Sequence, residues 1–376
     1  MKNTFGSQLC LTLFGESHGP AAGAVLDGLP AGLCVDTGFL AACMDKRRAR
    51  GDGLTTARTE ADQVSILSGV YQGRTTGTPI TLTIANTNIR PADYQKTAAL
   101  LRPGHADYTA FCKYHGFQDA RGGGHFSGRL TAPLVAAGAL CLSALNGKGI
   151  SIVTHLARCA GVADTPFAAD DPTLLARQMA AVDAAPGFAL IDPAAEAPMQ
   201  AAIRAAGASR DSTGGILETA VTGLPAGLGE PFFDNAESVL SHMLFSIPAV
   251  KGVEFGLGFA FADRLGSAAN DAFTMTAGRV TTQTNHNGGI NGGITNGMPL
   301  VFRTAVKPTP SIAAPQATIS WPGGQPATLQ LQGRHDPCIL PRAAIVQSCA
   351  AAVALCDLAC AQFGPQWLNP TPSNFE

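Results

Sequence analysis

The chain has 376 residues, a formal net charge of −2, 46% hydrophobic residues and only 14% charged residues. This length can bury a sizeable core as one large domain or two ordinary ones. The near-neutral charge excludes a general nucleic-acid binder, which would carry a basic excess. The small charged fraction favours an oligomer, because a monomer of this size would normally present more charge to water.

The longest apolar runs are short and are interrupted by glycine, proline or charged residues, so we expect no membrane helix. The first ten residues lack a basic region followed by an apolar one, so no signal peptide is expected. Ten cysteines without a CxxC pair indicate reduced, buried small side chains in a cytoplasmic protein. Cys356 and Cys360 stand one helical turn apart, but no histidine or second cysteine pair supports a metal site.

Helical patterns and their boundary residues predict several elements along the chain. We expect helices at 37–50 (with Gly51 as its stop), from Ser127 to Leu145, from Asp171–Pro172 onward, at 235–245 and at 342–363. We expect strands at 79–85, 252–259 and 300–305. Strands between helices without regular alternation favour the α+β class. No linker is evident, so we predict one domain over residues 1–376.

One turn sequence occurs twice, about half a chain apart. Residues 24–33 read AVLDGLPAGL and residues 220–228 read AVTGLPAGL. In both places a short apolar strand enters the turn and a helical stretch follows. This pattern predicts two related halves around a common core. Chance recurrence of a common turn is the alternative.

The first segment whose residues could take part in catalysis is GESHG at 15–19. Its glycines allow a tight turn that leaves Ser17 and His18 projecting from a strand end. His18 could act as a general acid near neutral pH, or it could be a satisfied surface histidine. GESHG also fits the GxSxG spacing of a serine-hydrolase elbow, which makes a hydrolase the competing hypothesis.

Two further loops combine glycine with basic residues. RPGHADY places Arg102 and His105 on one turn. RGGGHFSGR, at 121–129, has three glycines that allow close approach to a ligand, and Ser127 opens a helix whose amides favour an anion. A tight turn with an ordinary helix cap is the alternative for this second loop.

Two C-terminal segments are also rich in polar groups. NHNGGINGGITNG at 285–297, followed by KPTPS at 307–311, could surround a planar ring and its phosphate, or could form a flexible loop. In GRHDPC, at 333–338, Asp336 could be a positioned base or a helix cap paired with Arg334.

Basic residues cluster at the end of the first predicted helix, at Lys46, Arg47, Arg48 and Arg50. A solvated helix end that complements the helix dipole is one interpretation. Together with arginines of the loops they could instead neutralise a polyanion, because arginine forks match carboxylate and phosphate oxygens.

Six motifs, in this order, resemble those of chorismate synthases over nearly the whole chain: GESHG, DQVSILSGVYQGRTTGTPI, RPGHADYT, KGVEFG, NGGINGGITNG and GRHDPC. The resemblance implies a β-α-β sandwich of two related halves, assembled as a homotetramer with one reduced FMN per subunit. It implies a phosphate lyase that performs the anti-1,4-elimination of phosphate from 5-enolpyruvylshikimate 3-phosphate. The product is chorismate, at the last step of the shikimate pathway to the aromatic amino acids.

The hydrolase hypothesis is disfavoured, because it requires an Asp/His pair after the serine and gives the basic cluster no role. Two alternatives stay open: a divergent flavoprotein acting on another phosphorylated cyclohexene, and a non-catalytic binding paralogue. Some family members reduce FMN with NADPH, whereas we expect an external reductant here.

The resemblance also implies roles for single residues. His18 matches a proton donor to the departing phosphate, His105 a group at the flavin N1–C2 carbonyl edge, and Asp336 an acid that relays a proton through flavin N5. The implied substrate-binding residues are Ser17, Arg47, Arg102 and Arg129. The implied flavin-binding residues are His125, Phe126, Ser127, Ala249, Gly292, Lys307, Pro308, Thr309, Pro310, Ser311 and Arg334.

The chain departs from the family pattern near these positions. The family commonly has GGGRSSARET where residues 122–131 read GGGHFSGRLT. Gly53 stands where a second arginine is usual, and Pro248 where an asparagine is usual. Each lost charged hydrogen bond would weaken ligand binding by about 1.5–3 kcal/mol. We therefore expect an active enzyme with weakened FMN or substrate affinity.

Overall fold

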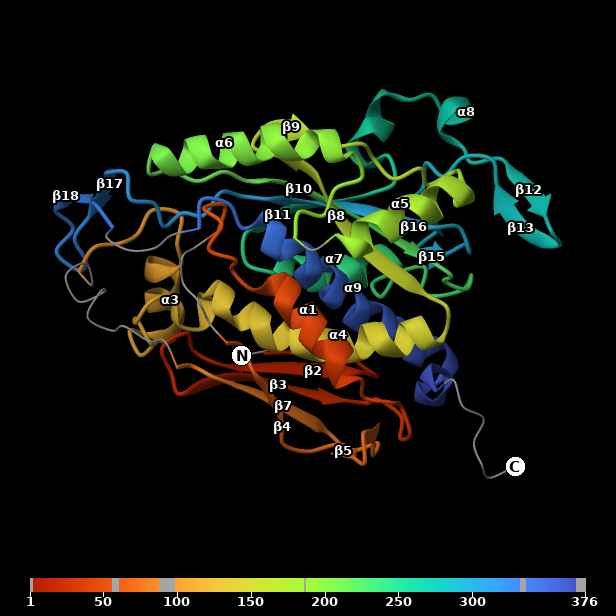
Figure 1. The fold of residues 1–376 in the computed structure, drawn as a ribbon, viewed down its shortest axis with the longest axis horizontal. Helices are drawn as coiled ribbons and strands as arrows, with labels where there is room; N and C mark the ends of the chain where they lie inside the picture. Colours follow the sequence, from red (N-terminus) through yellow and green to blue (C-terminus); the bar gives the residue numbers. More distant parts are fainter. Residues whose placement is uncertain (1–2, 56–60, 88–98, 186, 332–335, 370–376) are drawn as a thin grey trace.

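Two five-stranded antiparallel sheets enclose a layer of helices in the computed structural model, which describes residues 3–55, 61–87, 99–185, 187–331 and 336–369 (Figure 1). The first sheet contains β1 (Thr4–Phe5), β2 (Cys10–Gly15), β3 (Ala21–Asp27), β7 (Ile80–Ala85) and β4 (Val64–Ile66), in that order. The second contains β11 (Val250–Phe255), β16 (Leu300–Val306), β10 (Gly215–Thr222), β8 (Ser151–Cys159) and β9 (Val162–Ala163), in that order. This arrangement confirms the predicted α+β sandwich.

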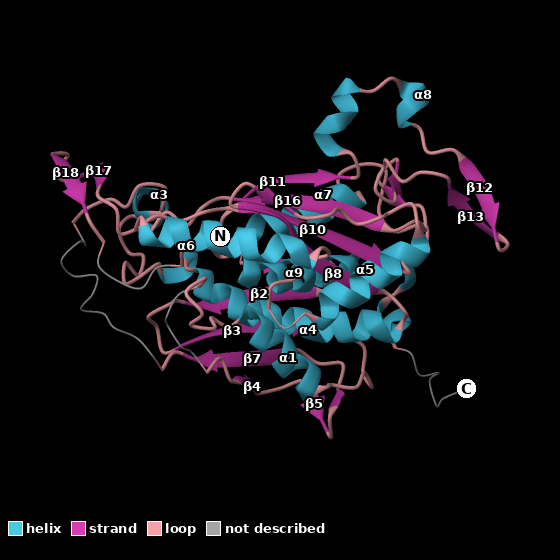
Figure 2. Ribbon diagram, turned by 45° about the horizontal axis from the view of Figure 1, so that its top comes forward, coloured by secondary structure: helices cyan, strands magenta, loops and turns pink. Residues whose placement is uncertain are grey.

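The helices between the sheets are α1 (Thr37–Arg47), α4 (Thr131–Gly147), α7 (Ala236–Ser246) and α9 (Leu340–Phe363). The other helices are α3 (Asp107–Tyr114), α5 (Pro172–Ala184), α6 (Glu196–Ala208) and α8 (Gly266–Ala269). Four hairpins complete the described strands: β5–β6 (Val70–Tyr71, Arg74–Thr75), β12–β13 (Phe273–Thr276, Arg279–Thr282), β14–β15 (Ile290–Asn291, Ile294–Thr295) and β17–β18 (Gln316–Ile319, Pro326–Leu329). Figure 2 shows β12–β13 and β17–β18 at opposite ends of the molecule.

The two halves have the same topology. The order β2-β3-β7-β4 in the first sheet corresponds to β8-β10-β16-β11 in the second. In each half the second of these strands leads to a helix, α1 or α7, and the half ends with a long helix, α4 or α9. The internal repeat predicted from the turn sequence is therefore confirmed.

A threonine fixes the repeated turn in the same way in each half. Thr75 donates its hydroxyl to the carbonyl of Pro30 (2.5 Å) and accepts from the amide three residues further on (3.0 Å). Thr295 does the same with Pro225 (2.8 Å) and the corresponding amide (2.9 Å). Each threonine lies in the second strand of a short hairpin. The repeat thus extends from topology to individual hydrogen bonds.

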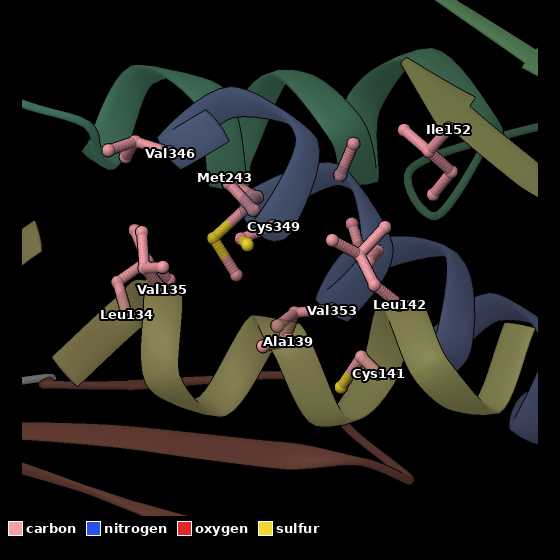
Figure 3. Packing of buried hydrophobic residues seen from close by; sticks show 14 of the residues in the cluster. Leu134, Val135, Ala139, Cys141, Leu142, Ile152, Met243, Val346, Cys349 and Val353 are labelled. Atoms are coloured by element: carbon pink, nitrogen blue, oxygen red, sulfur yellow. The ribbon is translucent and has the colours of Figure 1, made fainter. Parts of the chain in front are cut away.

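The long helices α4 and α9 pack against each other and form the centre of the core. Figure 3 shows Val135 and Leu142 of α4 facing the same interior as Val346, Cys349 and Val353 of α9. A helix sheltered all round does not need a polar stripe, which explains why both are apolar on every side.

Both helices are long and apolar enough to cross a membrane, contrary to our expectation that the apolar runs are too short. In the segments Gly128–Gly147 and Leu340–Phe363, however, 78% and 89% of the most apolar 18-residue stretch is buried inside the protein, as in core helices.

A close contact between α4 and α9 depends on a glycine. A Cβ added to Gly138 would lie 2.5 Å from the Cβ of Cys349 and 2.6 Å from its carbonyl oxygen. Backbone atoms cannot move aside as the end of a flexible side chain can. The absence of a side chain at Gly138 therefore allows the two helices to pack this closely.

Several predicted boundaries need correction. The first helix ends at Arg47, not at residue 50, because Arg48 is already extended (φ −64°, ψ 149°). The strand predicted at 252–259 ends at Phe255, and a 3-10 helix, Gly258–Asp263, follows. Ser127 caps a 3-10 helix, Gly128–Leu130, before α4 begins. The helices predicted from 171 and at 235–245 and 342–363 are confirmed within two residues.

The cysteines are less uniformly buried than predicted. All ten are free thiols, and seven are buried. Cys34 and Cys112 are exposed, because they lie in a loop and on the outer face of α3. The prediction of a single domain over residues 1–376 stays a prediction.

Replacing Gly138 with alanine is expected to lower the free energy of unfolding by about 1–3 kcal/mol, because the added methyl group forces α4 away from α9. Denaturant unfolding followed by circular dichroism measures this change. Gly266→Ala is the matched control, because no atom lies within 4 Å of a Cβ at that helical glycine. Equal stability of the two variants would contradict the proposed close contact.

Candidate active site

A cleft of about 1110 Å³ opens at the end of the helical layer and takes residues from both halves. Its walls include the end of α1, the loops before α3 and α4, the end of α7, and the start of α9. The predicted site residues that line it are Arg47, Arg102, His105, His125, Phe126, Ser127, Arg129, Ala249, Lys307, Thr309, Pro310, Ser311 and Asp336.

Four predicted residues do not line this cleft, and one cannot be placed. Gly292 lies at the exposed turn of the β14–β15 hairpin. Pro308 is absent from the walls although both its neighbours line them. Arg334 lies outside the described residues. The other two of the four, Ser17 and His18, are buried just behind the cleft.

Ser17 and His18 follow β2 and are each only 3% exposed. The Ser17 hydroxyl lies 3.0 Å from His18 Nδ1, and the Ser17 amide donates to the Gly124 carbonyl at 3.0 Å. A Cβ on Gly122 would lie 2.4 Å from His18 Cε1. Gly122 itself lines the cleft, so the His18 ring packs directly behind that wall. Burial of Ser17 argues against an exposed hydrolase elbow, and burial of His18 argues against a surface histidine.

Arg47 and Arg129 share one buried carboxylate, that of Asp62. Arg47 Nη1 donates to Asp62 Oδ2 at 2.8 Å, and Arg129 Nη1 donates to Asp62 Oδ1. The three side chains are 2%, 6% and 1% exposed for Arg47, Arg129 and Asp62. Arg47 is therefore not part of a solvated basic helix end, whereas Lys46 is, in an exposed pair with Asp183. Sequence reasoning missed Asp62, whose one signal was its place at the start of the DQVSILSG motif.

His105 and Arg102 are held by the same carboxylate, Asp107. His105 Nδ1 lies 3.2 Å from Asp107 Oδ1, and Arg102 donates its backbone amide (2.9 Å), Nε (2.8 Å) and Nη2 (2.5 Å) to Asp107. Burial raises the pKa of the Asp107 carboxyl, but the hydrogen bonds from Arg102 and His105 outweigh it and hold that pKa well below its usual range. The carboxylate orients the imidazole, with Nδ1 turned towards it.

Asp336 is held by an arginine that the sequence did not single out. Arg342 Nη1 donates to both carboxylate oxygens of Asp336, at 3.1 and 3.0 Å, and both residues line the cleft. The N-cap of α9 is Ile339, so Asp336 is not a helix cap. The only sequence signal for Arg342 was its position in the first turn of a predicted helix.

The segment Lys307–Ser311 forms a further wall beside the His105 loop. Lys307 Nζ donates to the Gly104 carbonyl at 2.6 Å, and the Lys307 amide donates to the Ala249 carbonyl at 2.9 Å. Ala249 has φ +77°, a strained value for a residue with a side chain. The hydroxyl of Thr309 is buried and has no hydrogen-bond partner among the described residues. A buried donor of this kind is suited to a ligand atom.

Three of the residues that depart from the family pattern, His125, Phe126 and Pro248, also lie at the cleft. His125 Nδ1 is 2.8 Å from the Gly15 carbonyl, so its imidazole ties the glycine-rich loop to the end of β2. Phe126 is 38% exposed and makes an edge contact with Tyr114 at 6.2 Å between ring centroids. Pro248 lines the cleft, and Gly53 does not.

Replacing Asp107 with asparagine is expected to lower the free energy of unfolding at pH 7 by about 1.5–3 kcal/mol, because charge-assisted hydrogen bonds are lost. Since the folded-state pKa lies below the unfolded value, the wild type holds this advantage above about pH 4 and loses it as the pH falls further. Denaturant unfolding of both proteins between pH 3 and 7, values chosen to bracket the unfolded-state pKa of aspartate at about 3.9, tests this. A difference in unfolding free energy between the two proteins that does not decrease below about pH 4 would contradict this prediction. Asp183→Asn, which breaks only an exposed pair, is the control.

Comparison with known proteins identifies the family. The sequence profile of the family described as chorismate synthase matches residues 9–360. The chain is 44% identical over 360 residues to a chorismate synthase of Dehalococcoides mccartyi, covering 96% of this chain and 97% of that protein. It is 45% identical over 355 residues to a chorismate synthase of Chitinophaga pinensis, covering 94% and 96%.

A solved structure gives the same answer. A chain described as "Crystal Structure of Chorismate Synthase" superposes with a TM-score of 0.74 at 26% identity, covering 96% of this chain and 93% of that one. The profile match, the curated relatives and the shared fold together show that this chain belongs to the chorismate synthase family.

Proposed function

We propose that this chain forms chorismate by the anti-1,4-elimination of phosphate from 5-enolpyruvylshikimate 3-phosphate, with reduced FMN bound beside the substrate in the described cleft. The observation that carries the proposal is one large cleft whose walls bring together cationic, imidazole and carboxylate groups from both halves of the chain. A divergent flavoprotein and a non-catalytic paralogue are disfavoured, because relatives 44–45% identical over nearly their whole length are named chorismate synthases.

The wall made by Lys307, Thr309 and Ala249 suits a flavin mononucleotide. The Lys307 ammonium supplies a positive charge, and the buried Thr309 hydroxyl has a hydrogen bond to give. The strained backbone at Ala249 is the kind of feature found where a chain approaches a ligand closely. We propose that these residues, with Ser127, Pro310 and Ser311, hold the cofactor. Arg334, Pro308 and Gly292 stay predicted contacts, as do His125 and Phe126.

The part of the wall that carries the arginines suits the anionic substrate. The substrate carries one phosphate and two carboxylates, and Arg47, Arg129 and Arg102 bring guanidinium groups to the cleft. The low overall charge of the chain therefore does not conflict with a polyanionic ligand, because the cations are concentrated at the site. Ser17 is proposed to contact substrate from behind the same wall.

Reduced FMN, when bound, supplies electron density to the allylic system of the substrate and recovers it, so phosphate leaves without net oxidation. We propose that His18 donates a proton to the departing phosphate, from its place against Gly122. His105, oriented by Asp107 at its Nδ1, presents Nε2 as the other nitrogen for contact with the cofactor. The Asp336 carboxylate, fixed by Arg342, is proposed to hold and release the transferred proton.

We further propose a cytoplasmic homotetramer that receives reduced FMN from an external reductant rather than reducing it with NADPH. The arm that carries α8 and β12–β13 extends from one end of the molecule (Figure 2). It presents exposed apolar side chains, which supports association. They are Phe259, Leu265, Phe273, Met275 and Val280. Sedimentation equilibrium should give four times the mass of one chain, and NADPH with oxidised FMN should not support turnover.

Anaerobic incubation of the purified chain with chemically reduced FMN and 5-enolpyruvylshikimate 3-phosphate is expected to release chorismate and inorganic phosphate in equal amounts. Chorismate is followed by its absorbance and phosphate by a coupled assay. No chorismate at saturating reduced FMN would contradict the proposed function. Because the chain departs from the family pattern at the cleft, the titration should extend to FMN concentrations well above those a tight binder needs.

His105→Ala and Asp336→Ala are each expected to lower kcat by about 10²–10⁴-fold, because a positioned proton-transfer or charge-stabilising group is lost. KM should change much less, since neither residue is proposed to bind the substrate anions. Steady-state kinetics under anaerobic conditions measures both constants. His115→Asn is the matched control: His115 is exposed, and asparagine tolerates its left-handed backbone (φ +55°). A loss confined to KM would contradict the assigned roles.

A further inference from the structure

Asp62 is the one acidic side chain that contacts both Arg47 and Arg129 among the described residues. Its carboxylate is 1% exposed and lies at the wall of the cleft. Its backbone has φ +46°, a left-handed value that aspartate and asparagine adopt more readily than most residues. A residue held in a strained conformation, with a buried charge, at the wall of a ligand cleft is suited to a specific task.

On one side, Asp62 connects to the loop that carries His18. Arg129 Nε donates to Asn86 Oδ1 at 3.0 Å. Asn86 Nδ2 in turn donates to the carbonyls of Glu16 and Gly19, both at 2.9 Å. These carbonyls flank Ser17 and His18. A shift of the Arg129 guanidinium would therefore be transmitted to the turn that holds the proposed proton donor.

On the other side, Asp62 connects to the segment that carries Asp336. Arg47 Nε donates to the Thr131 hydroxyl at 2.9 Å, which fixes the guanidinium plane at the start of α4. The Arg47 carbonyl accepts from Arg342 Nε at 2.9 Å. Arg342 holds both oxygens of Asp336. Arg47 thus links its buried cluster with Asp62 and Arg129 to the proposed acid.

The charges of the cluster make its central carboxylate necessary. Two guanidinium groups held this close and this deeply buried repel each other and lose solvation. Asp62 lies between them, offers one oxygen to each, and reduces their combined charge from +2 to +1. Without it the two arginines would keep their charge but lose the one carboxylate that they share among the described residues.

We propose that Asp62 is a positioning residue that holds Arg47 and Arg129 at the cleft wall and, through them, aligns the His18 loop with the Asp336 segment. This inference rests on the proposed function, because it assigns Asp62 a role in the same reaction. Asp62 contacts neither substrate nor cofactor in this role. It acts by fixing the guanidinium groups that meet the substrate anions.

The test compares wild type with Asp62→Asn, which keeps the side-chain shape and the left-handed backbone but removes the charge. We expect kcat for 5-enolpyruvylshikimate 3-phosphate to fall by about 100-fold, the effect of a small misplacement of positioning groups. KM at low salt should change by less than about 3-fold, because the wall gains positive charge. KM should then rise more steeply with KCl than in wild type, since the added charge is screened by salt.

A second variant, Asp62→Glu, keeps the charge but moves it by one methylene. Its kcat should also fall, whereas the KCl dependence of its KM should stay that of the wild type. A merely structural role would lower the melting temperature and the active fraction without changing the KCl dependence. If Asp62→Asn does not fold, kcat of the folded Asp62→Glu protein decides the question. Asp183→Asn is the control, because Asp183 pairs with Lys46 on the surface outside the cleft.

The outcomes separate the two proposals. A wild-type chain that forms no chorismate overturns the proposed function. An active wild type together with folded Asp62→Asn and Asp62→Glu proteins whose kcat values are within twofold of it overturns only the role of Asp62. A large fall in kcat, with the altered KCl dependence confined to Asp62→Asn, supports it.

Discussion

The contact between α4 and α9 is the constraint on which the rest of the structure depends. Each helix covers one sheet and is itself covered by the other helix, so neither half can bury its apolar surface alone. Both helices begin at the same end of the layer, where Leu134 and Val346 line the cleft (Figure 3). The spacing that Gly138 permits therefore sets the distance between the loop before α4 and the segment before α9. The geometry of the site therefore depends on how the two helices pack in the core.

Pairing of opposite charges explains how a nearly neutral chain builds a cationic cleft. The arginines at the wall are neutralised in part by partly buried carboxylates beside them, as in the pairs Arg102–Asp107 and Arg342–Asp336. Buried charges are tolerated when they are paired and hydrogen-bonded, and pairing also fixes the guanidinium planes. Composition reports only the sum of these charges, −2, and so conceals the local arrangement.

Those features of the fold that arise from local patterns could be predicted from the sequence. The α+β class, the repeat at 24–33 and 220–228, and the helices opened by Asp171 and Asn235 all rest on turn chemistry and capping. The end of α1 could not be predicted, because the chain leaves the helix where Arg47 turns inward to Asp62. The partners of Arg129 and Arg342 are likewise set by contacts between segments far apart in sequence. β8 was missed, since its residues (SIVTHLARC) show no strict alternation along a strand that is mostly buried.

The hydrogen bonds at the wall join the residues of the proposed site into one connected network. From the turn at Glu16, contacts run through Asn86, Arg129, Asp62 and Arg47 to the segment of Asp336. Groups that share such a network lose more than their own contact when one is removed, and a second loss in the same network then costs less. Single substitutions along this path should therefore be non-additive, whereas substitutions at Lys307 or Thr309, which are not part of this path, should add to them. Such a pattern would distinguish one connected wall from a set of independent anion contacts.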